Sequence, residues 1–184
     1  MLLLMAYYPE LQNKLQDEIA RVLGDSMPHV NDQSRLPYVL AYISETLRYR
    51  SPLAFTLPHR ALDHVQFGIR YNIPTDTMVI VNLNSMLMDE NVWSQPKKFN
   101  PDRFLNAHGD FCKINANAFM PFGTGRRICV GEQLGMNDLF VTLVRFLQLT
   151  KDYRIELASD RFTIEPDPKG LIFQFPSDFE VVLH

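Results

Sequence analysis

Apolar residues recur at helical spacing near the start of the chain. One stripe, with gaps of four, four and three residues, consists of Leu11, Leu15, Ile19 and Val22. Pro9 stands where a first helical residue is favoured, and Gly24 stands where a helix commonly ends. A second stripe after Pro37 consists of Leu40, Ile43 and Leu47. The pattern therefore predicts a helix between Pro9 and Gly24, a polar loop over 25–35, and a second helix that begins at Pro37.

The pattern changes to strict alternation of apolar and polar residues over 65–73. Turn-forming residues follow at 74–77, where Asp76 tolerates turn conformations, and a second apolar run covers 78–83. These features predict a hairpin over 65–83. Further short elements are predicted from composition and alternation: a helix over 85–89 and strands over 162–165, 171–175 and 179–183.

The segment 132–149 is long enough for a helix of about five turns, and its apolar residues cover most of the circumference, which predicts burial. Met1–Tyr8 is apolar but too short to span a bilayer, so we expect the last turns of a buried helix. Residues 91–119 have no clear period, and a loop of this length is usually functional. The predicted fold is α+β and mostly helical, with small antiparallel sheets around the helices.

Composition narrows the class of protein. The chain has 184 residues, enough for one domain, with 46% apolar and 21% charged residues. A net charge of −3 gives no basic field for nucleic acid. The two cysteines, Cys112 and Cys129, do not form a disulfide framework and fit a reducing compartment, although one disulfide between them is possible.

The richest motif is the segment 122–131, in which one cysteine lies among glycines and two arginines. Glycine lets the backbone approach a ligand closely or adopt positive φ. Arg127 can pair with an anion, and a helix starting just after Cys129 favours a thiolate. This arrangement suits a flat, anionic metal cofactor. It also suits a cysteine-nucleophile enzyme, although the nearest upstream histidine is His108, and a buried structural thiol is the plainer alternative.

The pattern F-x-x-G-x-R-x-C-x-G resembles the haem-binding loop of the cytochrome P-450 family. The matching residues are Phe122, Gly125, Arg127, Cys129 and Gly131. The resemblance implies haem b, with Cys129 as the axial ligand of the iron, Arg127 on a propionate, and the other three residues around the cofactor. It extends over the chain in the correct order and is strongest to the microsomal animal branch. The chain 1–184 then corresponds to a single partial domain, the C-terminal haem-ligating part, without the N-terminal part and membrane anchor.

Glu45 and Arg48 lie three residues apart and share one helix face. A solvated surface ion pair is the plainer interpretation. The family resemblance implies a different one, because Glu-x-x-Arg is its second signature and an arginine from a downstream loop joins the pair. Residues 101–104 match that loop, so Arg103 is the expected third member. The three residues would hold 91–119 against the helix and so position the cysteine loop.

The resemblance also implies contacts on the other side of the cofactor. His59 would pair with a second propionate, with Arg60 as a competing candidate. Residues after the Glu-x-x-Arg helix and near the turn at Gly170 would line a pocket for a lipophilic substrate, although each of them can equally be core. The substrate-lining candidates are Leu53, Ala54, Leu57 and Leu171.

For the intact protein the resemblance implies a monooxygenase that inserts one oxygen atom of O₂ into an organic substrate and reduces the other to water. Electrons would come from NADPH through a flavoprotein reductase, docked on a basic face, at the cytosolic side of the endoplasmic reticulum membrane. The basic residues are Lys97, Lys98, Lys113, Arg126 and Arg127. This chain alone is expected to have little activity. The alternative is a truncated, non-catalytic haem-binding or regulatory relative.

Overall fold

The computed structural model describes residues 1–112, 119–170 and 172–184. The helices are α1 (Leu2–Tyr7), α2 (Pro9–Val22), α3 (Pro37–Tyr49), α4 (Leu83–Leu87) and α5 (Glu132–Leu149), with 3₁₀ turns η1 (Val30–Arg35), η2 (Pro101–Phe104) and η3 (Gly125–Arg127). The strands are β1 (His59–Arg60), β2 (Val65–Phe67), β3 (Tyr71–Ile73), β4 (Met78–Val79), β5 (Ile155–Leu157) and β6 (Val181–Leu183). They form three two-stranded antiparallel sheets. The predicted fold class, mostly helical with small antiparallel sheets, is confirmed.

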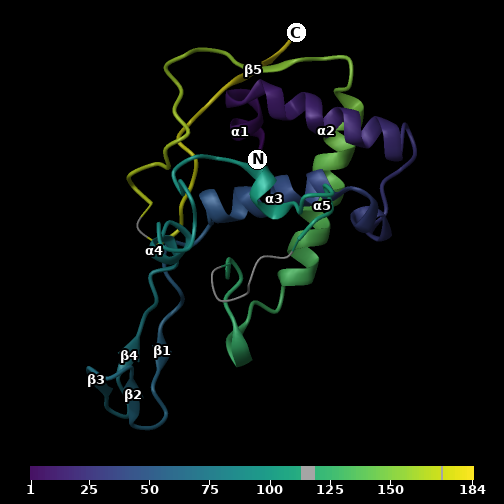
Figure 1. The fold of residues 1–184 in the computed structure, drawn as a ribbon. Helices are drawn as coiled ribbons and strands as arrows, with labels where there is room; N and C mark the ends of the chain where they lie inside the picture. Colours follow the sequence, from purple (N-terminus) through teal and green to yellow (C-terminus); the bar gives the residue numbers. More distant parts are fainter. Residues whose placement is uncertain (113–118, 171) are drawn as a thin grey trace.

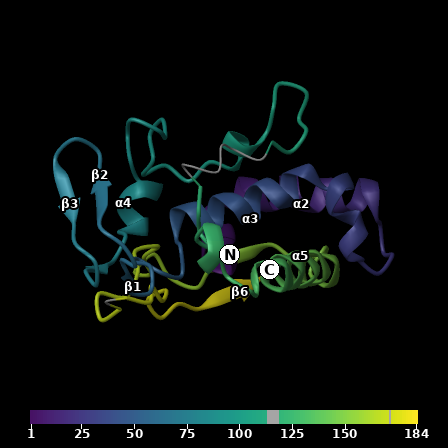
Figure 2. The same ribbon diagram turned by 90° about the horizontal axis from the view of Figure 1, so that it is seen from below.

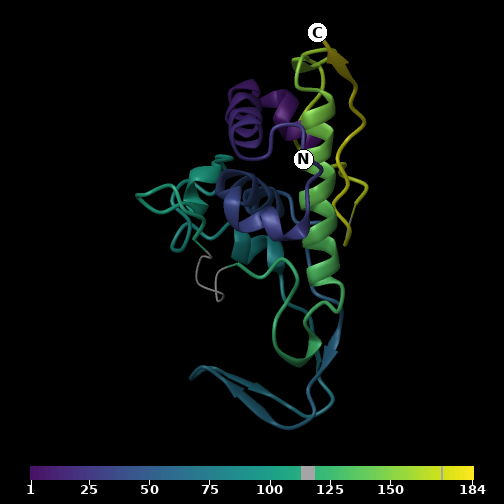
Figure 3. The same ribbon diagram turned by 90° about the vertical axis from the view of Figure 1, so that its right-hand side faces the viewer.

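The helical body contains the main core. α5 runs along one side of it, while α2 and α3 cross α5 one above the other (Figures 1 and 3). α2 begins at Pro9 as predicted, and Gly24 follows its end with φ +56° and hydrogen bonds to two α2 carbonyls. Residues 3–6 of α1 are buried as expected, whereas Leu2 is half-buried and Tyr7 is exposed. The core of this body includes Met5, Leu15, Ile19, Val39, Ile43, Val144 and Leu147.

Residues 25–35 are more ordered than a loop, because their second half forms η1. Asp32 accepts the N–H of His29 at 2.9 Å and pairs with Arg35 at 2.8 Å, and Arg35 also donates to the carbonyl of Val22. Local polar hydrogen bonds, and not a stripe of apolar residues, stabilise this segment. The 3₁₀ turn therefore has no hydrophobic signature.

The predicted hairpin, in which 65–73 pairs with 78–83, is wrong because these strands have other partners. The turn lies at Gly68, where φ is +60°, so β2 pairs with β3 and Val65 lies opposite Ile73. β4 pairs instead with the earlier strand β1. Alternation continues across the Gly68 turn and therefore cannot reveal it. Asp76 adopts φ +68°, in line with its expected place in a turn.

Two of the three tail strands also differ from the prediction. Residues 162–165 form no strand, and within 172–175, the described part of the predicted strand 171–175, only an isolated bridge joins Phe173 to Leu53. The third run contains β6, which pairs with the unpredicted strand β5. A buried glutamine of α2, Gln12, donates to one backbone carbonyl near β5 and accepts the N–H of Ile155 at 3.1 Å, so a side chain takes the place of a neighbouring strand.

α5 has the predicted bounds, but only its second half is buried. Leu143, Val144 and Leu147 lie in the core, whereas Leu134 is 74% exposed. The predicted helix at 85–89 starts two residues earlier, because Asn82 caps it by accepting the N–H of Ser85 at 2.8 Å. Among the helices of the described segments, none has the length and hydropathy of a membrane span.

Candidate functional site

Backbone hydrogen bonds close the cysteine-containing loop on itself. The N–H of Cys129 donates to the carbonyl of Phe122 at 2.9 Å, and the N–H of Ile128 donates to that of Gly125 at 3.2 Å. Gly123 and Gly125 adopt φ of +79° and +68°. Side chains rarely tolerate these angles, so both glycines are required by the backbone path. Gly123 has the same conformational role as Gly125 and was not singled out from sequence.

The Cys129 thiol is exposed and free, and Cys112 is likewise a free thiol. The alternatives of a buried structural thiol and of a disulfide are therefore wrong for this structure. α5 begins three residues after Cys129, and the N–H of Glu132 donates to the Cys129 carbonyl at 3.2 Å. The N–H of Glu132 is therefore not available to donate to the Cys129 sulfur. The sulfur lies 3.8 Å from the position that a Cβ on Gly131 would occupy.

The apolar residues next to Cys129 in sequence are exposed. Val130 is fully exposed, and Ile128 and Leu134 are 48% and 74% exposed. Exposed apolar surface around a single soft ligand is what a flat, hydrophobic iron macrocycle would cover. No group of three or more His, Cys, Asp and Glu side chains in the described segments could chelate a bare metal ion. The donor set therefore fits haem better than it fits a protein-chelated metal.

Phe122 connects the loop to the helix that follows. Its ring is half-buried against the main core, and Gly135 of α5 lies beneath it, where an added Cβ would sit 3.8 Å from the ring edge. Sequence inspection missed Gly135. Its signal was a glycine inside an otherwise apolar helix, a position that usually has a packing reason.

Glu45 and Arg48 are completely buried on α3, so the interpretation as a solvated ion pair is wrong. The guanidinium of Arg48 donates to both carboxylate oxygens of Glu45, at 2.7 and 2.8 Å. It also donates to the carbonyls of Leu87 and Pro96, at 2.9 and 2.8 Å. These hydrogen bonds satisfy the buried charges and attach α3 to the chain that leaves α4.

Arg103 reaches the same carboxylate from η2, with its Nε 3.3 Å from Glu45. The N–H of Asn100 donates to Glu45 at 2.9 Å. The remaining nitrogens of Arg103 donate to three loop carbonyls, those of Ser94, Gln95 and Lys98. The structure thus brings the three predicted residues together and fixes residues 94–103 against α3.

The cationic candidates lie at one end of the molecule, away from the C-terminus (Figures 1 and 3). Arg127 is exposed in η3, next to the cysteine. His59 and Arg60 are exposed on β1, where successive side chains point to opposite faces. Arg60 pairs with Asp76 at 3.3 Å.

Three of the four substrate-side candidates lie in the chain that follows α3. Ala54 is buried, Leu53 is half-buried and Leu57 is 60% exposed, while Leu171 lies outside the described residues. Two backbone hydrogen bonds join 52–54 to 172–174, at 2.9 and 2.8 Å. The two segments expected to line one pocket are therefore neighbours.

Four of the five basic candidates are exposed: Lys97, Lys98, Arg126 and Arg127. The fifth, Lys113, lies outside the described residues. Seen from below, loop 94–103 and the cysteine loop lie on either side of α3 (Figure 2).

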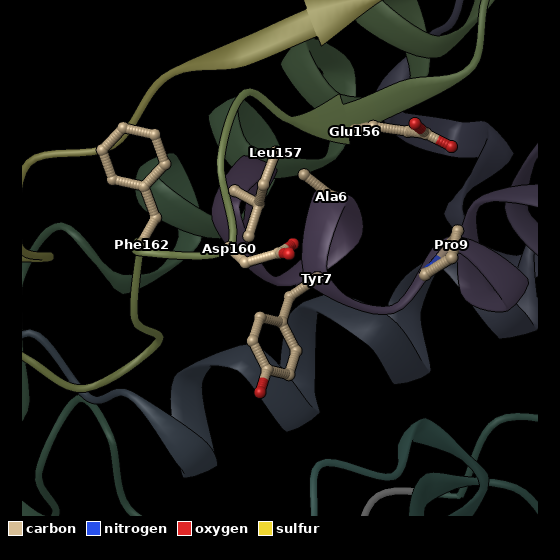
Figure 4. A pocket seen from close by; sticks show the side chains of 7 residues that line it. All are labelled: Ala6, Tyr7, Pro9, Glu156, Leu157, Asp160 and Phe162. Carbon is tan, nitrogen blue, oxygen red and sulfur yellow. The ribbon is translucent and has the colours of Figure 1, made fainter.

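A separate open hollow of about 360 Å³ lies between α1 and the segment that begins at β5 (Figure 4). Tyr7, Glu156, Asp160 and Phe162 are among its lining residues. It is at the opposite end of the molecule from the cysteine loop (Figure 1) and contains no soft metal ligand. We therefore do not regard it as the cofactor site.

Comparison with known proteins gives a consistent result. The family model described as Cytochrome P450 matches residues 1–179. Cytochrome P450 2K6 from Danio rerio is 46% identical over 147 residues, which are 80% of this chain and 28% of that protein. Steroid 17-alpha-hydroxylase/17,20 lyase from Ictalurus punctatus is 37% identical over 99% of this chain and 33% of its own length. Cytochrome P450 2K4 from Oncorhynchus mykiss is 43% identical over 92% of this chain and 35% of its own length. The chain spans about a third of the length of these curated relatives.

Proposed function

The chain belongs to the cytochrome P450 family, and on that premise we propose that it is the haem-ligating part of a haem-thiolate monooxygenase, in which the Cys129 thiolate would hold the iron. The observation that carries this proposal is the exposed thiol of Cys129 in a loop fixed by its own backbone hydrogen bonds and by two positive-φ glycines. A ligand held in this way needs no rearrangement when the cofactor binds.

When bound, haem supplies the oxygen chemistry, in which one atom of O₂ enters an organic substrate and the other becomes water. The chain would supply ligation and orientation. Cys129 would hold the iron through its sulfur, an electron-rich ligand. Phe122, whose ring packs on the core and on Gly135, would keep the loop in place, and Gly125 and Gly131 keep the loop free of side chains near the cofactor.

Arg127 and His59 would hold the two carboxylates of the cofactor. A guanidinium matches a carboxylate with two parallel N–H donors, which suits Arg127. For the second carboxylate, the ion pair between Arg60 and Asp76 favours His59 over Arg60, because the two neighbours face opposite sides of β1.

Glu45, Arg48 and Arg103 act as structural supports in this proposal and not as catalysts. Their hydrogen bonds end on backbone carbonyls and on one another, so none of the three has a free group for chemistry. By fixing residues 94–103, they position the chain that leads into the cysteine loop.

We propose a small lipophilic substrate. Leu53, Ala54, Leu57 and Leu171 would contribute apolar contacts, as expected for a pocket that fixes an organic molecule mainly by burial. One of the relatives described above is a steroid hydroxylase by name, and a substrate of comparable hydrophobicity is consistent with these residues.

Electron delivery would use the exposed basic residues Arg126 and Arg127 of the cysteine loop and Lys97 and Lys98 of loop 94–103, together with Lys113. An acidic surface of an NADPH-dependent flavoprotein reductase is the complementary partner, because opposite charges speed and orient association. The working location of the intact protein would be the cytosolic face of the endoplasmic reticulum membrane.

For these 184 residues alone we propose haem ligation with little turnover. On the substrate side, Leu57 is 60% exposed, so water would reach the iron from that side. Ligation without turnover would correspond to the alternative of a non-catalytic haem-binding relative, and product formation in the presence of reductase separates the two.

The test is an absorption spectrum of the haem-loaded chain, reduced with dithionite under carbon monoxide. The parent chain and Cys112→Ala should give the strongly red-shifted Soret band typical of thiolate ligation, whereas Cys129→Ala should lose it. Cys112 is a matched control because both thiols are free and exposed. Loss of the band in Cys112→Ala alone, a band that survives Cys129→Ala, or no haem uptake by the parent chain would contradict the proposal.

A further inference from the structure

Arg50 closes the C-terminal end of α3 and reaches across to the tail of the chain. Its Nε donates to the carbonyl of Ile164 at 2.9 Å, and its Nη2 lies 3.1 Å from the carboxylate of Glu165. A third donor, Nη1, bonds to the carbonyl of Tyr49 at 3.0 Å, and the guanidinium lies 4.2 Å from the centre of the Tyr49 ring. One side chain thus joins segments more than a hundred residues apart in sequence.

The tail that Arg50 contacts folds back on itself. Pro166 bridges Pro176, and the N–H of Asp167 donates to the carbonyl of Phe175 at 2.9 Å. The returning limb pairs with the chain just after α3: the N–H of Ala54 donates to Ile172, and the N–H of Gln174 donates to Pro52. The tail is therefore attached to α3 and its continuation at two places, by Arg50 and by this backbone pairing.

We propose that Arg50 is a positioning residue that holds the described parts of the tail, 163–170 and 172–176, against residues 52–54, and so sets the shape of the substrate-side wall. The inference rests on the proposed function, because it takes both segments as pocket-lining. α3 then organises both sides of the cofactor. Glu45 and Arg48 hold the chain that leads to the cysteine loop, and Arg50, two residues later, holds the substrate side.

The contacts indicate which interaction matters. The side chain of Arg50 is 22% exposed, whereas that of Glu165 is 70% exposed. An exposed ion pair contributes little, so the bond to the Ile164 carbonyl and the contact with Tyr49 should dominate. Lysine carries the same charge but offers neither the planar stack nor the fixed donor geometry. It should restore the function of Arg50 only in part.

A lysine-specific protease tests the attachment directly on the 184-residue chain, with or without haem. Lys169 is exposed at the tip of the tail, and Lys151, paired with Asp25 at the end of α5, is an internal reference. Arg50→Met should speed cleavage after Lys169 about tenfold, as expected when hydrogen bonds from a charged group are lost. Cleavage after Lys151 should not change.

Two companion variants make the result specific. Arg50→Lys should give an intermediate rate, and it still decides the question if Arg50→Met does not fold. Glu165→Gln should change the rate by less than about twofold. An unchanged rate after Lys169, or a parallel rise after Lys151 that indicates general loosening, would overturn the proposal.

A ligand measurement tests the effect on the wall. In the haem-loaded chain, imidazole and 1-phenylimidazole both ligate iron, but only the second has an apolar ring to meet the wall. Arg50→Met should weaken binding of 1-phenylimidazole several-fold and leave imidazole unchanged, and equal effects on both would overturn the role in shaping the pocket. If the parent chain takes up no haem, the proposed function fails, while the protease result still decides whether Arg50 holds the tail.

Discussion

The two ends of α5 lie in different surroundings. Around its second half, together with α1, α2 and α3, apolar side chains are buried: Leu15 and Val144 are 0% exposed. Around its first half and the sheets β1–β4, comparable side chains face outward, with Ile69 at 92% and Leu134 at 74%. One continuous helix therefore connects a packed hydrophobic core to a region in which most apolar side chains are exposed.

The difference shows that two kinds of force maintain the two regions. Hydrophobic burial holds the helical body together. At the cysteine end, order comes from backbone hydrogen bonds and from glycines with positive φ. A region built in this way leaves its apolar surface available, which is what a binding site for a large hydrophobic cofactor requires.

Removal of Glu45 should give the largest effect, because its buried carboxylate pairs with Arg48 and Arg103 and so attaches loop 94–103 to the helical body. Glu45→Ala leaves the buried guanidinium of Arg48 without its anion, and we expect a loss of about 3–5 kcal/mol in the free energy of unfolding. Asp102→Asn is the control, since Asp102 is half-exposed and lies 3.7 Å from Lys14. It should cost less than about 1 kcal/mol. Urea denaturation measures both, and equal losses would mean that burial of the network is unimportant.

Truncation of two leucines in α5 tests the comparison within a single helix. Leu147 is 1% exposed and Leu134 is 74% exposed. Leu147→Ala should lower the free energy of unfolding by about 2–5 kcal/mol through loss of burial and formation of a cavity. Leu134→Ala should change it by less than about 0.5 kcal/mol. The comparison would be broken if thermal or urea unfolding gave similar losses for both variants in the haem-free chain.

Two glycine substitutions separate backbone strain from crowding in the cysteine loop. Gly125→Ala forces a side chain into φ +68° although nothing lies near its Cβ, and should cost about 1–2 kcal/mol. Gly131 has φ −92°, so Gly131→Ala should be neutral or stabilising by up to about 1 kcal/mol. Differential scanning calorimetry of the haem-free chain compares them. A larger loss of stability for Gly131→Ala would mean that crowding against the Cys129 sulfur, and not backbone strain, restricts the loop.

The sequence predicted α2 and α3 well because both begin at a residue with a strong local preference. Pro9 and Pro37 open α2 and α3, and Gly24 follows α2. The strands were predicted poorly. Alternation over 65–73 has the same period on both sides of the Gly68 turn, so it does not reveal the turn. β5 was missed because one of its N–H groups is satisfied by the side chain of Gln12, and no strand pattern in the sequence indicates such a bond.

The site shows the same division between local and long-range information. The spacing of Glu45 and Arg48 indicates a shared helix face, but their burial depends on carbonyls 39 and 48 residues away. Gly123 and Gly135 were missed because their roles, a positive φ and a ring contact, arise only once the loop has closed on α5. The contacts of Arg50 with the tail are likewise invisible to local patterns.

The smallest expected effect concerns a polar group inside the helical body. Glu18 of α2 accepts the N–H groups of Tyr38 and Val39, each at 3.0 Å, at the start of α3. Desolvation raises the pKa of Glu18 above 4.5, although these two hydrogen bonds oppose the shift. The folded state then binds this proton more tightly than the unfolded state. The stabilising contribution of Glu18 is therefore complete below pH 4.5 and lost as the pH rises through the raised pKa.

The slope cannot exceed about 1.4 kcal/mol per pH unit, the value for one proton, and Glu18→Gln should remove it from urea unfolding measured as a function of pH. Asp25 has a pKa shift of the opposite sign and serves as the control. Its hydrogen bond and charge interaction with Lys151 lower its pKa below 3.8, so its contribution is present above that pH and lost as the pH falls. Asp25→Asn should therefore leave the slope above pH 4.5 unchanged. If Glu18→Gln also left that slope unchanged, the Glu18 carboxylate would not be the source of the pH dependence. Burial of Glu18 in the packed region would then contribute less to stability than we infer from the comparison of the two regions.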